Sequence, residues 1–207
     1  MIHNLAAGVQ AFTSNAFLVS GPASADAPAA DDDGDAGRRV LVDTGSNFDI
    51  LPLVDERVDG LDAVVLTHTH HDHVGNVDAV CDAYDVETWG FDTEQPSVDN
   101  AIPDEGTVEL GLGSYEALHT PGHKDDHLCF YDEAAGVLFA GDLIFQNGGF
   151  GRTDLEEGDR PTLIRSLDRV RDRVGDDLAE LHVGHGPSVL DAPFDHVELA
   201  ARAARTR

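Results

Sequence analysis

Lysine is almost absent from this sequence: Lys124 is the only one, and 13 lysine and arginine residues together face 40 aspartate and glutamate residues. The formal charge of −27 repels phosphate groups, so it argues against nucleic acids and anionic membranes as partners. The same charge destabilises a compact chain in dilute buffer, whereas at 1 M salt the screening length falls to about 3 Å. We therefore expect a halophilic protein adapted to a salt-rich cytoplasm; an ordinary acidic protein is the alternative.

Cysteines and long apolar runs are scarce as well. The two cysteines, Cys81 and Cys129, form no CxxC pair, so we expect small buried side chains in a reducing compartment. No stretch approaches 18 apolar residues, which argues against a membrane-spanning helix. The first residues, MIHNLAAGVQAF, lack the basic start and apolar run of a signal peptide. These observations predict a soluble cytoplasmic protein.

The length of 207 residues suits one domain with a sizeable core. We expect a single domain over residues 1–207, and the sequence does not indicate an oligomeric state. The one low-complexity stretch is SADAPAADDDGDAG at 24–37. Because it lies between two strand-like runs, we interpret it as a solvated, acidic surface loop inserted between them.

Short β-rich runs bounded by turn residues predict strands, and amphipathic runs predict helices. The predicted strands are 15–20, 38–45, 61–67, 85–90, 107–113, 114–119, 127–132, 136–141 and 179–184. The predicted helices are 74–84, 159–174 and 195–207. Many strands with a few interleaved helices indicate an α/β or α+β fold with a layered sheet.

The stretch THTHHDHVG at 67–75 places four histidines and an aspartate within six positions. If the preceding strand stays extended, alternate side chains share a face, and one face then carries His68, His70 and Asp72. His71 points to the other face, and a turn at the start of the next helix brings His73 inward. A metal site is one interpretation, because imidazole is the commonest metal ligand. A solvated, histidine-rich turn is the other.

Three later segments favour the metal site, because each ends a strand-like run in a histidine or an aspartate. In HTPGH a Pro-Gly turn sets the direction of His123, and in VGHG glycines flank His185. LFAGD closes an apolar run with Asp142, a buried charge that needs a cationic partner. Strand ends of this kind are typical of a site assembled along one edge of a sheet.

These motifs, in this order, resemble those of the metallo-β-lactamase superfamily over about residues 12–190. The resemblance implies a four-layer αββα sandwich with two divalent metal ions, Zn²⁺ first and Fe or Mn as alternatives. Asp142 would bridge the two ions and act in catalysis with Asp72, and Asp43 in VLVDTG would orient a ligand histidine from behind. The implied ligands of the first ion are His68, His70 and His123, and those of the second are Asp72, His73 and His185.

Within the superfamily, TPGH and GRTDL at 151–155 resemble the glyoxalase II and persulfide dioxygenase branch. The implied activity is hydrolysis of a small-molecule acyl thioester, such as an S-lactoyl thiol, by a metal-bound hydroxide. The alternatives are a mononuclear Fe(II) persulfide dioxygenase that uses His68, His123 and Asp142, and hydrolysis of another small ester or lactone. Few residues follow Gly186, so the short members of the branch fit better, and glutathione is not implied as the thiol.

Two cations near these motifs are candidates for binding an anionic substrate. Arg152 lies in GRTDL, where a salt bridge to Asp154 or another acid is the alternative. Lys124 takes the position after His123 that is usually Thr in this branch, and an exposed charge is the alternative. The remaining motif-adjacent histidines are expected to be structural: His71, His119, His127 and His182.

Overall fold

A computed structural model describes residues 1–21 and 37–206. The predicted acidic loop at 24–37 lies outside the described residues except for Gly37. Among the helices that the described residues form, none has the length and apolar character needed to cross a membrane.

The N-terminal half of the chain forms a six-stranded mixed sheet in the order β1-β2-β3-β4-β5-β6. The strands β1, β2 and β3 pair antiparallel, and β3 to β6 pair in parallel. Their bounds are β1 Ile2–Asn4, β2 Phe17–Val19, β3 Val40–Val42, β4 Ala63–Val65, β5 Thr88–Gly90 and β6 Asn100–Ala101.

The second sheet has five strands in the order β13-β10-β9-β8-β7. Its strands pair antiparallel except β10 with β13. Their bounds are β7 Thr107–Leu110, β8 Gly113–His119, β9 Leu128–Asp132, β10 Val137–Phe139 and β13 Glu180–His182. A separate two-stranded ribbon, β11 Ile144–Phe145 with β12 Gly149–Phe150, flanks the 3₁₀ turn η1 Gln146–Gly148.

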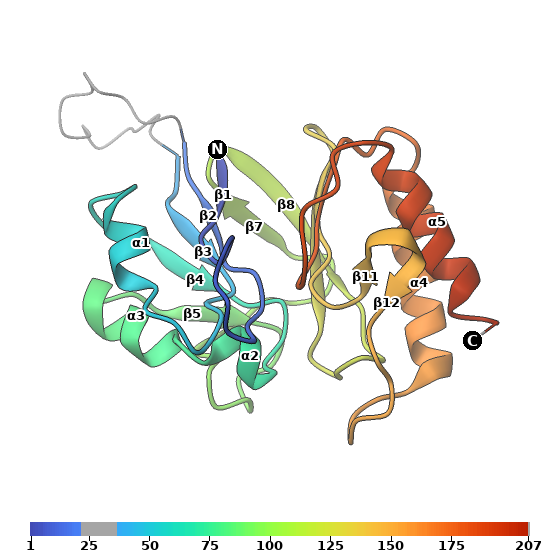
Figure 1. The fold of residues 1–207 in the computed structure, drawn as a ribbon, viewed down its shortest axis with the longest axis horizontal. Helices are drawn as coiled ribbons and strands as arrows, with labels where there is room; N and C mark the ends of the chain where they lie inside the picture. The colour runs from blue at the N-terminus through green and yellow to red at the C-terminus, as the bar shows by residue number, and fades with distance from the viewer. Residues whose placement is uncertain (22–36, 207) are drawn as a thin grey trace.

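Helices cover the outer face of each sheet, as Figure 1 shows. On the first sheet lie α1 Leu51–Asp55 and α3 Val77–Tyr84, and the one-turn helix α2 His71–Val74 lies at the end of this sheet. On the second lie α4 Arg160–Val174 and α5 Pro193–Ala203. The four layers are therefore helix, sheet, sheet and helix, the αββα sandwich that the resemblance implied.

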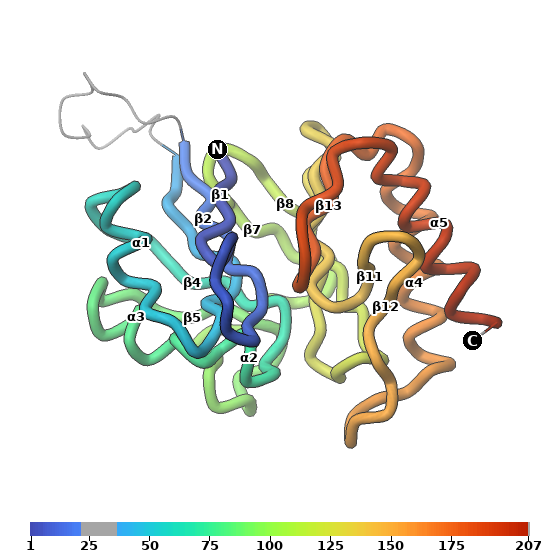
Figure 2. Tube along the Cα trace, in the orientation of Figure 1, coloured from blue at the N-terminus to red at the C-terminus, as the bar shows by residue number. Residues whose placement is uncertain are grey.

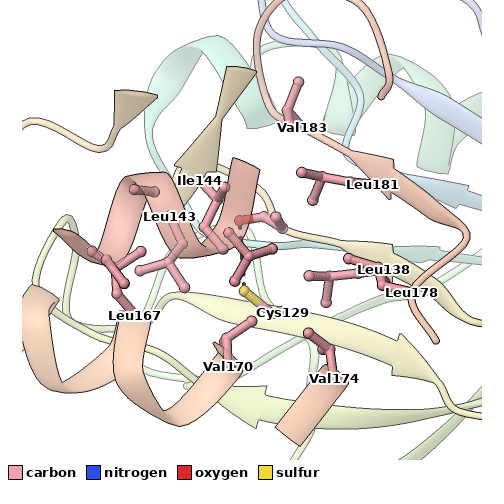
Figure 3. Close-up of a cluster of buried hydrophobic side chains, with 14 of the residues drawn as sticks. Cys129, Leu138, Leu143, Ile144, Leu167, Val170, Val174, Leu178, Leu181 and Val183 are labelled. Atoms are coloured by element: carbon pink, nitrogen blue, oxygen red, sulfur yellow. Dashed lines mark hydrogen bonds between the residues drawn. The ribbon is translucent and has the colours of Figure 1, made fainter. Parts of the chain in front are cut away.

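Three hydrophobic clusters fill the spaces between these layers. One joins α1 and α3 to the outer face of the first sheet, and a second joins the facing sides of the two sheets through residues such as Phe17, Phe130 and Phe139. In the third, Leu167, Val170 and Val174 of α4 pack against Cys129, Leu138 and Leu181 of the second sheet (Figure 3). Alternating side chains on β9 and β10 serve two of these clusters at once, which ties the layers together.

Each predicted strand run contains a strand, and each predicted helix overlaps a helix. The sequence patterns did not predict several short elements: β1, β6, β11, β12, the five-residue α1, the one-turn α2 and the 3₁₀ turn η1. One local expectation needs correction. The extended backbone after β4 ends at His70, which is extended (φ −63°, ψ 143°), and α2 begins at His71. A helical turn, not a continued strand, therefore positions Asp72 and His73.

Candidate metal centre

The predicted site residues come together at one end of the sandwich. Asp43 directly follows β3, and His68 follows β4 after a two-residue gap. In the second sheet, the end of β8 leads to His123, and the ends of β10 and β13 lead to Asp142 and His185. Because these strand ends share one edge of the sandwich, residues up to 142 positions apart in the sequence converge there (43 to 185).

Three imidazoles form a first group around one point. Nε2 of His68 lies 3.1 Å from Nδ1 of His70, which lies 3.0 Å from Nε2 of His123. The rings of His68 and His123 meet His70 nearly edge to face, so the nitrogens converge while the ring planes diverge. His68 and His123 are buried and His70 is half-buried. Three converging imidazole nitrogens form a ligand set suited to a divalent cation.

A second group combines Asp72, His73 and His185. Nε2 of His185 lies 3.1 Å from Oδ2 of Asp72, and one ligand atom of each residue lies within 4.8 Å of the others. His73 is fully buried, whereas Asp72 and His185 are partly open to solvent. This group therefore forms a second set of metal ligands, and solvent can reach it through Asp72 and His185.

The carboxylate of Asp142 lies between the two groups. Its Oδ1 lies 3.3 Å from Nε2 of His73, and its Oδ2 lies 3.4 Å from Nε2 of His123 and 3.5 Å from Nε2 of His185. Gly184 makes this placement possible, because a Cβ at that position would lie 2.0 Å from Oδ1 of Asp142. One carboxylate thus reaches ligands of both groups.

Four of the histidines are held from behind through the ring nitrogen that faces away from the centre. Nδ1 of His123 hydrogen-bonds the carbonyl of Arg152 at 2.8 Å, and Nδ1 of His185 hydrogen-bonds the carbonyl of Thr13 at 3.1 Å. Nδ1 of His68 lies 3.1 Å from the hydroxyl of Thr67. Such contacts fix the tautomer and direct the other nitrogen inward, as in metal sites generally.

Asp43 holds the fourth histidine and part of the backbone. Its Oδ2 accepts from Nδ1 of His73 at 2.8 Å and from the hydroxyl of Thr67 at 2.7 Å, while its Oδ1 accepts from the Thr67 amide at 2.8 Å. The residue has a left-handed backbone, with φ of 55°, an unfavourable conformation for a non-glycine residue. The hydrogen bonds at this position offset that strain and turn the carboxylate toward His73.

Two buried polar atoms at the centre, Nε2 of His73 and Oδ1 of Asp142, lie 3.3 Å apart but form no hydrogen bond with each other or with any other described residue. Unpartnered buried nitrogen and carboxylate atoms cost free energy unless a cation or a proton binds them. Together with the converging imidazoles, these atoms fit a pair of divalent metal ions. The donor set of five histidines and two carboxylates also suits Zn²⁺, Fe or Mn.

The electrostatics differ between the two groups. Burial lowers the pKa of His68 well below its usual value, and burial with the neighbouring His123 lowers the pKa of His70 to about 4. Both rings are therefore neutral at pH 7, the form that binds metal. Burial opposes protonation of His73 too, yet Asp43 and Asp142 raise its pKa to about 10. A field that attracts a proton so strongly also attracts a divalent cation.

The other histidines have structural contacts. His71 is exposed, His119 stacks on Phe91 with ring centroids 3.7 Å apart, and His182 hydrogen-bonds Glu180 and Ser188. Nε2 of His127 accepts from the Asp142 amide at 3.0 Å, so this residue positions the central carboxylate. The sequence patterns did not reveal the roles of Thr67 and His127. The available signal was their position, since Thr67 directly precedes the HTH motif and His127 lies four residues after His123.

The two candidate substrate cations differ in accessibility. The side chain of Arg152 is 62% exposed and forms a bidentate salt bridge with Asp154, the ion pair considered from the sequence. Lys124 is 5% exposed, and its ammonium lies 2.7 Å from Glu157 and 3.5 Å from Asp125 and Asp126. The salt bridge between Lys124 and Glu157 connects the segment after His123 to the loop that contains Arg152.

A sequence model of the metallo-beta-lactamase superfamily matches residues 33–185, the range that contains all seven converging residues. The chain belongs to the metallo-β-lactamase superfamily. Among its superfamily relatives is a hydroxyacylglutathione hydrolase of Chromohalobacter salexigens, 34% identical over 75% of this chain and 60% of the relative. Another is the hydroxyacylglutathione hydrolase GloC of Haemophilus influenzae, 33% identical over 73% of this chain and 82% of the relative. The chain thus spans under two thirds of the first relative's length.

Solved structures have the same fold. The di-iron-bound form of TTHA1623 is 29% identical, with a TM-score of 0.67 over 91% of this chain and 92% of that one. The BLEG-1 B3 metallo-beta-lactamase is 26% identical, with a TM-score of 0.69 over 90% of this chain and 94% of that one. Membership of the superfamily supports a metal-dependent hydrolase.

Proposed function

We propose that this superfamily member hydrolyses a small acyl thioester, of the S-lactoyl thiol class, at a binuclear metal centre. One observation carries the proposal: two groups of three ligand residues share the single carboxylate of Asp142. The curated relatives called hydroxyacylglutathione hydrolase support the thioester as substrate. Glutathione itself is not part of the proposal.

His68, His70 and His123 would hold one ion, Asp72, His73 and His185 the other, and Asp142 both. Bound there, two Zn²⁺ ions would supply a water of lowered pKa as nucleophile and a Lewis acid for the thioester carbonyl. The chain's own residues orient and retain these ions. The carbonyls of Arg152 and Thr13 and the carboxylate of Asp43 keep three imidazoles in the required tautomer.

The partly exposed residues indicate the side from which the substrate approaches. His70, Asp72 and His185 are partly exposed, whereas His68, His73 and His123 are buried. The guanidinium of Arg152 lies on the loop whose carbonyl holds His123, so we propose it as the group that binds an anionic end of the substrate. Lys124 would have to leave three carboxylates to do so, and we propose no substrate contact for it.

The test compares metal content and two reactions in the full-length chain. We expect two zinc ions per chain by mass spectrometry, and thiol release from an S-lactoyl thiol measured with a chromogenic thiol reagent. Asp142→Asn keeps the shape of the side chain but removes the shared charge, so we expect kcat/KM to fall by about 10³-fold or more. Asp82→Asn, an exposed carboxylate on α3, is the matched control and should keep full activity.

The same preparation distinguishes the alternatives. If the chain instead holds one iron ion and consumes oxygen when a persulfide is supplied, it is a mononuclear dioxygenase and not a hydrolase. An Asp142→Asn protein that keeps full thiol release would remove Asp142 from the mechanism.

A further inference from the structure

A cavity of about 490 Å³ lies at the end of the sandwich opposite the metal centre. Its walls include Val137 and Glu180, the first residues of β10 and β13. Asp142 and His185, by contrast, follow the last residues of the same two strands. The lengths of β10 and β13 therefore separate this cavity from the metal centre. The edge strands β1 and β13 both contribute residues to the cavity wall, and they lie on the same side of the molecule (Figure 2).

The size and rim of the cavity are those of a small-molecule site. Its volume falls within the roughly 300–1,000 Å³ range of ligand pockets. Leu112 and Leu190 at the rim are 61% and 66% exposed, although large apolar side chains are mostly buried in the described part of the chain. Exposed apolar side chains gathered around a hollow mark a binding surface. Further apolar walls come from Ile2, Val19, Leu110 and Val137.

Two largely buried polar side chains line this cavity, and each has one polar atom that faces its solvent. Tyr115 is 4% exposed and Asp132 is 6% exposed, and they lie on adjacent strands because Glu116 pairs with Tyr131 in the β8–β9 register. Oδ1 of Asp132 accepts from the Ala135 amide at 3.0 Å. Among the described residues, neither Oδ2 of Asp132 nor the Tyr115 hydroxyl has a hydrogen-bond partner, and both atoms are open to solvent in the cavity. A ligand that donates hydrogen bonds would replace the solvent at both atoms.

The charge of the cavity is negative. Glu180 also lines it, and Nε2 of His182 lies 3.0 Å from the Glu180 carboxylate, while Nδ1 lies 2.8 Å from the Ser188 hydroxyl. Burial lowers the pKa of His182, so its ring is neutral and does not offset the carboxylates. No lysine or arginine side chain is among the residues that line the cavity. The Met1 ammonium, which donates to the Ser20 carbonyl, is the cation of the lining and offsets one of the two carboxylates. The cavity therefore keeps a net negative charge, which favours cations over anions.

We propose that this cavity binds a small organic amine with an apolar body. The ammonium would donate to Oδ2 of Asp132 and lie against the Tyr115 ring, a geometry that favours cations. The apolar body would cover Leu112 and Leu190 at the rim. The proposed hydrolysis does not use this cavity, and this second site stands independently of it.

Isothermal titration of the zinc-loaded full-length chain with 4-phenylbutylamine tests the proposal. We expect saturable binding of one amine per chain, weaker binding of 4-phenylbutanol, and no binding of 4-phenylbutyrate. Asp132→Asn retains an oxygen for the Ala135 amide and loses only the charge, so binding of the amine should weaken by about tenfold. Asp78→Asn, an exposed carboxylate on α3, should bind the amine like the unmodified chain.

Three results would overturn the proposal: no saturable heat up to about 10 mM amine, equal binding in Asp132→Asn, or equal binding of 4-phenylbutyrate. If Asp132→Asn does not fold, as judged by circular dichroism, Glu180→Gln takes its place with the same expected weakening. Thiol release at the metal centre should be unchanged in either variant that folds.

Discussion

At the scale of single residues, the site depends on side chains that never touch a metal ion. Asp43 is the clearest case, because it binds His73 and both donors of Thr67, and Thr67 in turn contacts His68. One carboxylate therefore orients ligands of both groups. The free energy of metal binding includes this orientation, since a ring that rotates freely must be ordered when the ion binds.

Asp43→Asn should weaken metal binding without unfolding the chain. The amide has the size of the carboxylate, but it lacks the negative charge. That charge favours the tautomer of His73 that carries its proton on Nδ1 and leaves Nε2 free to face the centre. We expect zinc affinity to fall by about 10- to 100-fold, measured by competition with a chromogenic chelator. Asp49→Asn, a surface aspartate, serves as control; if both variants bind zinc equally well, Asp43 does not orient the ligands.

The two cysteines give a prediction about pH. Burial raises the pKa of Cys129 to about 12, and burial with nearby aspartates raises the pKa of Cys81 to about 11. Because the thiolate is the reactive form, alkylation at pH 8 should be slower in the folded chain than in the unfolded chain, on the order of 100-fold for Cys81 and on the order of 1,000-fold for Cys129. The rate should rise about tenfold per pH unit between pH 7 and 9, measured by mass spectrometry with iodoacetamide. A rate that stays constant over this range would contradict the raised pKa values.

At the scale of elements, the turn before His123 is fixed by helix α4. Gly122 has φ of +121°, and a Cβ there would lie 2.2 Å from the amide nitrogen of Leu163. The Gly122 carbonyl accepts from the Asp159 amide at 2.9 Å, and the Pro121 carbonyl accepts from the Ser166 hydroxyl at 2.7 Å. The side chain of Asp159 caps the helix through the Thr162 amide. The first turns of α4 thus set the direction of His123.

Gly122→Ala should therefore damage both stability and the site. The left-handed φ and the clash with the backbone of α4 should lower the free energy of unfolding by about 3 kcal/mol or more, measured by denaturant titration. Zinc content should fall as well, because His123 moves with the turn. Gly175→Ala, a glycine with φ of +59° and nothing within 4 Å of the added carbon, separates backbone strain from the clash. Equal losses in the two variants would mean that the contact with α4 is unimportant.

At the scale of the whole molecule, charge is the dominant feature. Most described arginines already pair with acids, as in Arg39 with Asp62, Arg169 with Asp104 and Arg173 with Glu116. With 40 acidic and 13 basic residues, most carboxylates have no cationic partner. Their mutual repulsion opposes folding until salt screens it.

The melting temperature should consequently rise by roughly 10 °C or more between 0.1 M and 3 M KCl, followed by circular dichroism of the zinc-loaded chain. Most of the gain should come below 1 M, where the screening length has already fallen to about 3 Å. A gain that grows steadily to 3 M would indicate ion exclusion instead of screening. Equal melting temperatures at both concentrations would contradict the proposed adaptation to salt.

The sequence by itself determined the layered α/β fold and the residue types at the strand ends, because both depend on local patterns: period-two apolar runs, turn glycines, and histidines placed directly after them. It also indicated the superfamily. The same resemblance implied that Asp142 lies between two ligand groups. Tertiary structure alone decided which nitrogen of each histidine faces inward, and that a one-turn helix positions Asp72. It also decided that Lys124 is buried among carboxylates, and that Tyr115 and Asp132 reach a second cavity. These features arise from contacts between segments far apart in the chain, and no local pattern specifies which segments meet.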